Sequence, residues 1–173
     1  MGKLFFGTQT GTTEGVADLI KKYLPNLVSE IKSIQFAKKE ELEACDFLVL
    51  GGSTWGDGEL TDDWLDFFPQ LDLISFAGKK VALFALGDQT GYSYNFVSAM
   101  KILYDKLKER GAELVACRVS KEGFDFDHSA SVVDGHFVGL VVDEVNEPEL
   151  TNERVKSWAQ EVLNAMGSIA VAV

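Results

Sequence analysis

The chain has 173 residues, of which 46% are hydrophobic and 25% are charged, and its formal net charge is -11. A chain of this length can bury a sizeable core, so we expect residues 1–173 to form a single domain. The negative charge argues against nucleic-acid binding and against docking on anionic membranes, because both need a basic surface. It favours transient encounters with basic surface patches of partner proteins.

Cysteine usage and the start of the chain predict a cytoplasmic protein. Cys45 and Cys117 lie at the edges of apolar segments without CxxC spacing, which favours small core residues over a disulfide or a metal pair. Met1-Gly2-Lys3 leads directly into an apolar run, without the segments typical of a signal peptide. No apolar run approaches the roughly 18 residues of a spanning helix, so we expect no membrane insertion.

The first half of the chain alternates between strand and helix patterns. Residues 3–6 are typical of a buried strand, and residues 30–37 alternate like a half-exposed edge strand with Ile34 and Phe36 on one side. An acidic turn at residues 39–43 leads to a second buried strand at residues 47–51. Between the first two strands, helical spacing relates Val16, Leu19, Ile20, Tyr23 and Leu24, and Pro25 ends this helix.

The second half continues the alternation. A helix is predicted up to Pro69, and residues 80–86 and 114–117 are typical of strands. The helix between those strands places Phe96, Met100, Leu103 and Leu107 on one face and ends at Gly111. A final helix carries Val155, Trp158, Ala159, Val162, Leu163 and Met166, and the small apolar stretch at residues 167–173 follows it without an assignment.

This order of elements predicts an α/β protein. Alternating strands and helices build right-handed β-α-β units, hence a doubly wound, five-stranded parallel sheet of order 2-1-3-4-5 with helices on both faces. The polar segment at residues 118–139 is too long for a simple loop. We therefore expect an insertion that interrupts the fifth strand, held to the body by Phe124, Phe126 and Phe137.

Three glycine-containing polar loops follow the first, second and third buried strands, and they would meet at the carboxyl edge of the sheet. The first runs Thr8-Gln9-Thr10-Gly11-Thr12-Thr13 and has no lysine or arginine. Its hydroxyls and inward-turned N–H groups could hold a phosphate monoester. The alternative is a threonine-rich N-cap for the first helix, with Thr12 or Thr13 as the cap.

The other two loops each carry an aromatic residue, Trp55 and Tyr92, within a glycine-rich turn. Two aromatic side chains beside a phosphate site indicate a flat ring held between them. A phosphate and a flat ring are the outline of a mononucleotide, and of FMN in particular.

Here the sequence resembles the flavodoxins over nearly its whole length. The matching stretches are Leu4 to Gly11, Thr54-Trp55 with Gly58-Glu59-Leu60, Asp63-Trp64, Gly87-Asp88-Gln89 with Gly91-Tyr92-Ser93, and Phe137 to Leu140. The last stretch resembles long-chain flavodoxins, and Val133-Asp134-Gly135 resembles the nitrogen-fixation type. Flavodoxins often have an acidic residue where this chain has Tyr94, and proline where it has Ser53.

The resemblance implies that Thr8 to Thr13 cradle the FMN phosphate, that Trp55 and Tyr92 stack on the two flavin faces, and that backbone groups of Gly56, Asp57 and Asp88 meet the ring edge. The remaining candidate cofactor-binding residues are Ser53, Thr54, Gly58, Gly87, Gly91, Tyr94 and Asn95. No catalytic or metal-binding residue is expected.

The implied function is a monomeric, low-potential one-electron carrier that shuttles between FMN semiquinone and hydroquinone. Its implied donor is a flavodoxin or ferredoxin reductase, and the nitrogen-fixation resemblance suggests nitrogenase iron protein as acceptor. Gly56 and Gly58 would let the intervening peptide turn over, so that its carbonyl could accept a hydrogen bond from flavin N5. The alternative is an FMN-dependent quinone or azo reductase.

Overall fold

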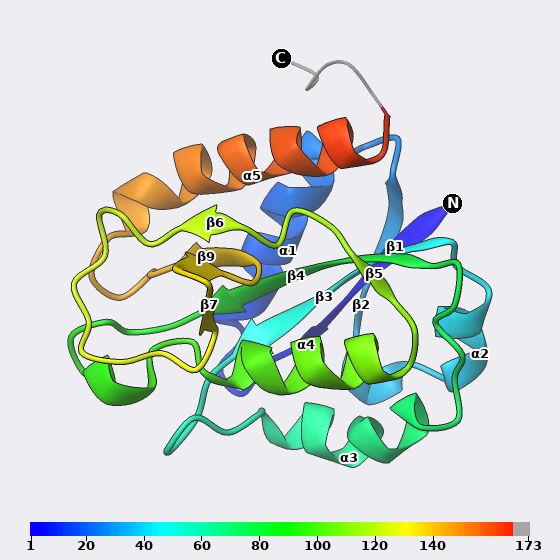
Figure 1. Cartoon of the computed structure of the whole chain (residues 1–173), viewed down its shortest axis with the longest axis horizontal. Coiled ribbons are helices and arrows are strands. Elements are labelled where there is room, and N and C mark those ends of the chain that lie inside the picture. The colour runs from blue at the N-terminus through cyan, green and yellow to red at the C-terminus, as the bar shows by residue number, and fades with distance from the viewer. Residues whose placement is uncertain (168–173) are drawn as a thin grey trace.

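The computed structural model describes residues 1–167; residues 168–173, most of the apolar stretch left unassigned above, lie outside the described residues. A parallel sheet forms the centre, with order β2-β1-β3-β4-β5 and β9 also paired to β4. Its strands are β1 (Gly2–Gly7), β2 (Val28–Ser33), β3 (Phe47–Ser53), β4 (Lys80–Leu86), β5 (Glu113–Leu114) and β9 (Leu140–Val142). The predicted doubly wound order is confirmed (Figure 1).

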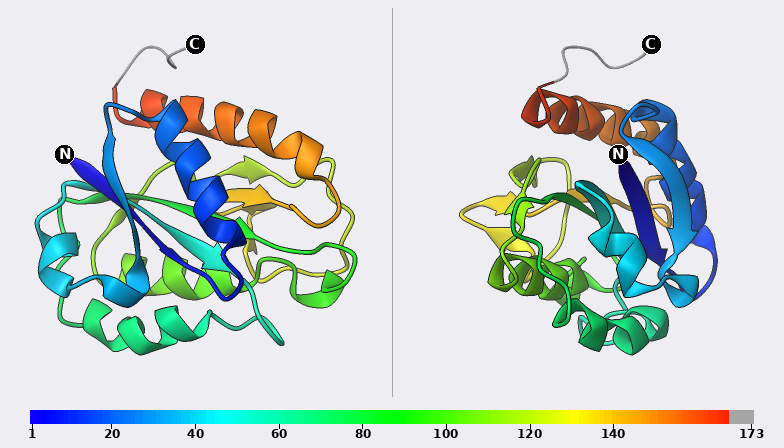
Figure 2. Two further views of the ribbon diagram at one scale, coloured as in Figure 1. Left: turned by 180° about the vertical axis from the view of Figure 1, so that it is seen from behind. Right: turned by 90° about the vertical axis from the view of Figure 1, so that its right-hand side faces the viewer.

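Helices cover both faces of the sheet, as Figure 2 shows in its right-hand view. One face packs against α1 (Thr12–Tyr23) and α5 (Thr151–Ala165), and the other packs against α3 (Asp62–Leu71) and α4 (Ala99–Glu109). The central strands β1, β3 and β4 are buried almost throughout because both of their faces contact helices. Within the described part of the chain, no helix has the length and apolar character that crossing a bilayer requires.

The fifth strand is split, as predicted. Its first part, β5, pairs with Lys80 and Val81 of β4, and its second part, β9, pairs with Phe84, Ala85 and Leu86. The strand predicted at residues 114–117 is shorter because Ala116 has a φ of 49°, which turns the chain away from β4.

Between the two parts lies a small antiparallel sheet of order β6-β8-β7, made of β6 (Val119–Ser120), β7 (Val132–Val133) and β8 (His136–Phe137). Phe124, Phe126 and Phe137 pack around the ring of Phe96, with centroid distances to it of 5.6, 5.2 and 6.0 Å. These aromatic contacts hold the insertion to the body, as the sequence predicted.

Four further local predictions were wrong. The edge strand predicted at residues 30–37 ends at Ser33, whose Oγ accepts a hydrogen bond of 3.3 Å from the Gln35 N–H and begins the 3-10 turn η1 (Ile34–Phe36). Ile34 is therefore buried while Phe36 is 69% exposed. Residues 39–43 form a short helix, α2 (Lys39–Glu43), rather than a turn.

The other two concern helix ends. Helix α3 continues past Pro69 to Leu71, because a proline in the last turn removes only one N–H donor. Phe96 precedes α4 rather than lying on it, since the 3-10 turn η2 (Ser93–Asn95) separates the third loop from the helix. A further 3-10 turn, η3 (Pro148–Leu150), leads into α5.

Candidate functional site

The first loop joins β1 to α1 and leaves the helix N-terminus without a side-chain cap among the described residues. The N-cap residue is Gly11, with a φ of 88°, and its N–H donates to Thr8 Oγ1 at 2.9 Å. The alternative of a threonine cap is wrong, because Thr12 and Thr13 lie inside the first turn of α1. The first N–H groups of α1 thus remain available to an anion.

Side chains from other loops hold the first loop in place. The Thr8 N–H donates to Asp63 Oδ2 at 2.9 Å, and buried Thr13 lies with its Oγ1 3.2 Å from Ser53 Oγ. Asp63 lies in the first turn of α3 and also accepts hydrogen bonds from Thr61 Oγ1 and from the Trp64 N–H. Sequence reasoning gave Asp63 no role, although it anchors the loop that carries the threonines.

The second loop is a tight turn closed by two backbone hydrogen bonds. The Trp55 N–H donates to the Glu59 carbonyl at 2.8 Å, and the Glu59 N–H donates to the Trp55 carbonyl at 2.6 Å. Inside the turn, Gly56 and Gly58 have φ values of 50° and 94°, a region that glycine adopts more readily than other residues. Asp57 lies exposed between them.

The third loop is organised by the carboxylate of Asp88. Its Oδ1 accepts hydrogen bonds from the Thr90 N–H at 3.1 Å, the Gly91 N–H at 2.7 Å and Asn146 Nδ2 at 2.9 Å. The Tyr92 N–H donates to the Asp88 carbonyl at 2.9 Å. These bonds fix the backbone that carries Tyr92.

A cavity of about 140 Å³ lies where the loops meet. Its lining is Thr10, Thr12, Ser53, Thr54, Trp55, Leu86, Gly87, Asp88, Tyr92, Glu144 and Val145. Trp55 and Tyr92 remain 37% and 52% exposed, so both rings present surface to a ligand. The carboxyl ends of β1, β3, β4 and β9 thus supply one site, at the point where the strand order reverses.

The other predicted residues adjoin this cavity in the same loops without lining it. They are Thr8, Gln9, Gly11, Thr13, Gly56, Asp57, Gly58, Gly91, Tyr94 and Asn95. Gly58 and Asn95 bring the second and third loops together, since a Cβ added at Gly58 would lie 3.5 Å from Asn95 Oδ1. Tyr94 is 72% exposed, and its carbonyl lies 3.2 Å from His128 Nδ1.

Sequence reasoning missed the fourth wall of the cavity. Glu144 and Val145 follow β9, the second part of the split fifth strand. A signal was present, because the polar residues from Asp143 onward follow the apolar run at residues 140–142 as loops follow the other strands. The insertion concealed which strand this run belongs to.

Buried Asp143 lies directly behind that wall. Its Oδ2 accepts hydrogen bonds from the Gln89 N–H and from Gln89 Nε2, and its Oδ1 accepts from the N–H groups of Val145 and Asn146. Burial raises the pKa of Asp143, but the hydrogen bonds from Asn146 and Gln89 outweigh burial and leave the pKa below its ordinary value. The structure therefore holds Asp143 as a carboxylate.

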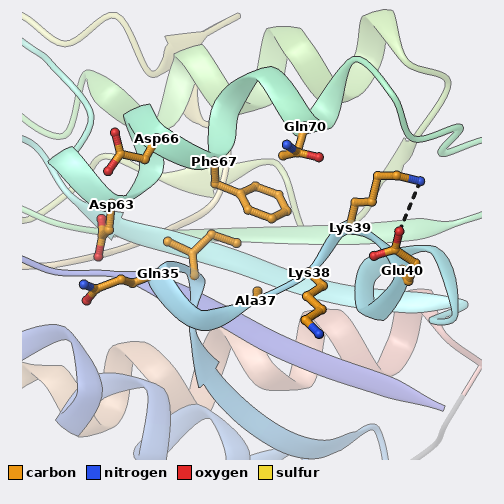
Figure 3. Close-up of a pocket in the computed structure, with 10 residues that line it drawn as sticks. Gln35, Ala37, Lys38, Lys39, Glu40, Asp63, Asp66, Phe67 and Gln70 are labelled. Carbon is orange, nitrogen blue, oxygen red and sulfur yellow. Dashed lines mark ion pairs between the residues drawn. The ribbon is translucent and has the colours of Figure 1, made fainter.

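Two other features of the described chain are separate from this cavity. Figure 3 shows a cavity of about 360 Å³ between η1, α2 and α3, in which Lys39 and Glu40 form an ion pair at 3.5 Å. None of the predicted cofactor-binding residues in the described chain lines it.

Cys45 and Cys117 are free thiols, and burial raises the pKa of Cys45. The described residues contain no group of three or more potential metal ligands.

Comparisons with known proteins agree on one family. The flavodoxin family profile matches residues 4–158. Flavodoxins of Synechocystis sp. and Klebsiella pneumoniae are each 46% identical over 160 residues, which cover 92% of this chain and 94% and 90% of those relatives. The structure of Fusobacterium nucleatum flavodoxin bound to flavin mononucleotide is similar with a TM-score of 0.87 at 30% identity, covering 95% of this chain and 97% of that one.

A doubly wound sheet with a cavity at the reversal of strand order is typical of nucleotide-binding α/β proteins. The comparisons define the class of protein more narrowly than the fold does: the chain belongs to the flavodoxin family. Flavodoxins are electron-transfer flavoproteins and not enzymes with substrate turnover, which favours the carrier over the reductase alternative.

Proposed function

We propose that this protein is a low-potential one-electron carrier that binds FMN non-covalently in the cavity between Trp55 and Tyr92. One observation carries the proposal: the same cavity is lined by threonines beside an uncapped helix N-terminus and by two exposed aromatic residues. Hydroxyl and amide donors suit a phosphate monoester, and aromatic faces suit a planar ring. The donor set of this chain therefore fits FMN.

The phosphate end of the proposed site is the first loop. Thr10 and Thr12 line the cavity, and the uncapped N–H groups at the start of α1 would offer the positive end of the helix dipole to the phosphate. Thr8, Gln9, Gly11 and Thr13 complete this end, with Thr8 and Thr13 fixed by Asp63 and Ser53. No cation is needed, because the phosphate of a resident cofactor is bound and not transferred.

The ring end is formed by the second loop, the third loop and the residues that follow β9. Trp55 and Tyr92 cover the two faces of the ring and exclude water. Backbone groups of Gly56, Asp57 and Asp88 would meet its polar edge, and Ser53, Thr54, Gly58, Gly87, Gly91, Tyr94 and Asn95 are the other candidate residues at this end. Bound FMN supplies one-electron chemistry, while the protein sets its potential.

Negative charge around the ring keeps that potential low. Asp57, Glu59 and Asp88 lie in the two loops that carry the aromatic residues, and their charges oppose the addition of a further electron. For a one-electron couple, a tenfold difference in affinity between two redox states corresponds to about 59 mV. A modest difference in the affinity of the protein for two redox states of the flavin therefore changes the potential of that couple substantially.

A reductive titration of the purified protein, followed by visible absorbance, tests the proposal. We expect one FMN per chain, released on acid precipitation, and reduction in two separated one-electron steps. Apoprotein that fails to bind added FMN would overturn the proposal. Reduction in a single two-electron step would contradict the carrier function while leaving FMN binding intact.

We further propose a single domain over residues 1–173, of the long-chain type, with an insertion at about residues 118–139. The split fifth strand supports this. We also propose a monomer in the cytoplasm, where free Cys45 and Cys117 fit a reducing compartment. The net charge of -11 supports partners with basic patches, such as a flavodoxin or ferredoxin reductase as donor.

The acceptor that we propose is nitrogenase iron protein, because residues 133–135 resemble the nitrogen-fixation type. Stopped-flow mixing of the fully reduced protein with oxidised iron protein tests it. We expect faster oxidation than for a flavodoxin of similar potential from an organism without nitrogenase. Equal rates would rule this acceptor out.

A further inference from the structure

The loop after β9 holds a carboxylate that the proposed function does not use directly. Asp143 has no exposed surface, and its two oxygens accept hydrogen bonds from five N–H groups. Three come from the residues that follow it, Val145 and Asn146, and two come from Gln89 in the loop after β4. A carboxylate so fully paired is costly to disturb, because each lost partner leaves a buried polar group unsatisfied.

Gln89 uses its whole side chain in the same cluster. It is 5% exposed, and its Nε2 donates to Asp143 Oδ2 at 2.8 Å and to Glu147 Oε1 at 3.0 Å. Its Oε1 accepts a hydrogen bond of 2.7 Å from the N–H of Asp125 in the insertion. Gln89 thus joins the loop after β4, the loop after β9 and the insertion.

This pair lies directly behind the ring end of the cavity. Gln89 follows Asp88 in the chain, and Asp143 precedes Glu144 and Val145; all three of these neighbours line the cavity. Asn146 adds a second link, because its Nδ2 donates both to Asp88 Oδ1 and to Asp143 Oδ2, each at 2.9 Å. None of the residues in the first loop takes part.

We infer that Asp143 and Gln89 are a positioning pair, which fixes the loops after β4 and β9 against each other and thereby sets the affinity of the site for the flavin ring. The inference rests on the proposed function, since the ring is that of FMN. Both residues act through the cavity wall and through the Tyr92 loop. Their contribution is therefore independent of the phosphate.

Riboflavin, which has the flavin ring but no phosphate, separates the two ends of the site. Asp143→Asn keeps the side-chain shape but replaces one oxygen by an NH₂ group, which cannot accept from the N–H groups that now face it. We expect the Kd values for riboflavin and for FMN to rise by the same factor, about tenfold or more. Thr12→Ala, in the phosphate end, should weaken FMN binding and leave riboflavin binding unchanged.

Two further variants complete the comparison of Kd values. Gln89→Glu also keeps the side-chain shape and the acceptor for Asp125, but it places a carboxylate against Asp143 and Glu147. At pH 8 it should raise the Kd values for riboflavin and for FMN, as Asp143→Asn does. Glu149→Gln removes one charge from the same segment, at an exposed residue outside the cluster, and should leave both Kd values within twofold of wild type.

Binding is measured at a temperature where far-UV circular dichroism shows every apoprotein to be folded, so that a loss of global stability does not enter the Kd. Visible circular dichroism of bound FMN provides a second readout, and we expect its bands to change in both pair variants because the ring orientation against Tyr92 changes. Hydrogen exchange of the apoprotein, which needs no flavin, should be faster at residues 87–92 and 143–147 in the pair variants.

Three results would overturn the inference: riboflavin Kd values within twofold of wild type in the pair variants, an effect on FMN alone, or unchanged exchange of the two loops. If Asp143→Asn does not fold, Gln89→Glu decides by the same criteria. Wild-type apoprotein that binds neither flavin would overturn the proposed function instead, while exchange would still test whether the pair fixes the two loops.

Discussion

Gly7 is the residue at which β1 ends and the threonine loop begins, and it has no room for a side chain. A Cβ added there would lie 2.2 Å from Trp64 Cδ1 and 2.5 Å from Thr61 Oγ1. Trp64 cannot move away readily, because it is buried and its Nε1 donates to the Gly51 carbonyl at 2.9 Å. The close approach of β1 to the start of α3 thus depends on glycine.

We predict that Gly7→Ala lowers the free energy of unfolding of the apoprotein by about 1–3 kcal/mol, the usual cost of overpacking a core. Gly15→Ala is the matched control, because the residue lies inside α1 and, apart from its chain neighbours and the nearby backbone of that helix, no atom of the described chain lies within 4 Å of a Cβ added there. Alanine should stabilise that position by about 0.5–1 kcal/mol. Urea unfolding measures both, and equal effects would contradict the prediction.

At the scale of elements, the turn at residues 54–59 is closed by backbone hydrogen bonds at its ends and has two glycines between them. The two hydrogen bonds between Trp55 and Glu59 close it, while Gly56 and Gly58 keep positive φ values. A valine at position 56 disfavours positive φ and restricts the peptide between Gly56 and Asp57. The closed turn would then lose its freedom to reorient a carbonyl toward the ring.

We predict that Gly56→Val narrows the gap between the two one-electron potentials of the bound flavin. Gly78→Val serves as control. Gly78 also has a positive φ, of 80°, and a Cβ added there would meet open space in the described chain. It precedes β4, so it lies at the amino ends of the strands, away from the cavity. Spectroelectrochemistry reports both potentials. A gap equal to that of wild type, or an equal change in Gly78→Val, would count against the prediction.

The sequence predicted elements well where one physical rule dominates. Strands β1, β3 and β4 are apolar on both faces, and their order follows from β-α-β chirality. Prediction failed where a single side chain decides, as when the Ser33 hydroxyl ends β2, or where distant contacts decide, as when Asp63 binds the Thr8 N–H. Glu144 and Val145 were missed because their strand is completed only after the insertion.

At the scale of the whole molecule, Asp143 links the site to the stability of the fold at acid pH. Burial raises its pKa, but the hydrogen bonds from Asn146 and Gln89 win, so the folded pKa lies below the unfolded value of about 3.9. A group of this kind stabilises the folded state fully above its unfolded pKa. That contribution is lost as the pH falls from there through the folded pKa.

We predict that the free energy of unfolding of the wild-type apoprotein falls more steeply below about pH 4 than that of Asp143→Asn, which has no proton to gain at this position. Glu149→Gln should follow the wild-type slope, because Glu149 is exposed. Urea unfolding at a series of pH values measures the slopes. Parallel curves for wild type and Asp143→Asn would show that the carboxylate does not have a lowered pKa.

The split fifth strand also affects how two copies of the chain can meet. A long, unpaired edge strand can act as a template for another chain, which leads to aggregation. Here the edge beyond β4 consists of β5 and β9, with two and three residues, so it offers no continuous row of free backbone groups. The opposite edge, β2, carries Glu30 and Lys32, each in an ion pair of 2.8 Å. Both edges of the sheet thus disfavour strand-to-strand polymerisation, and the insertion protects one of them.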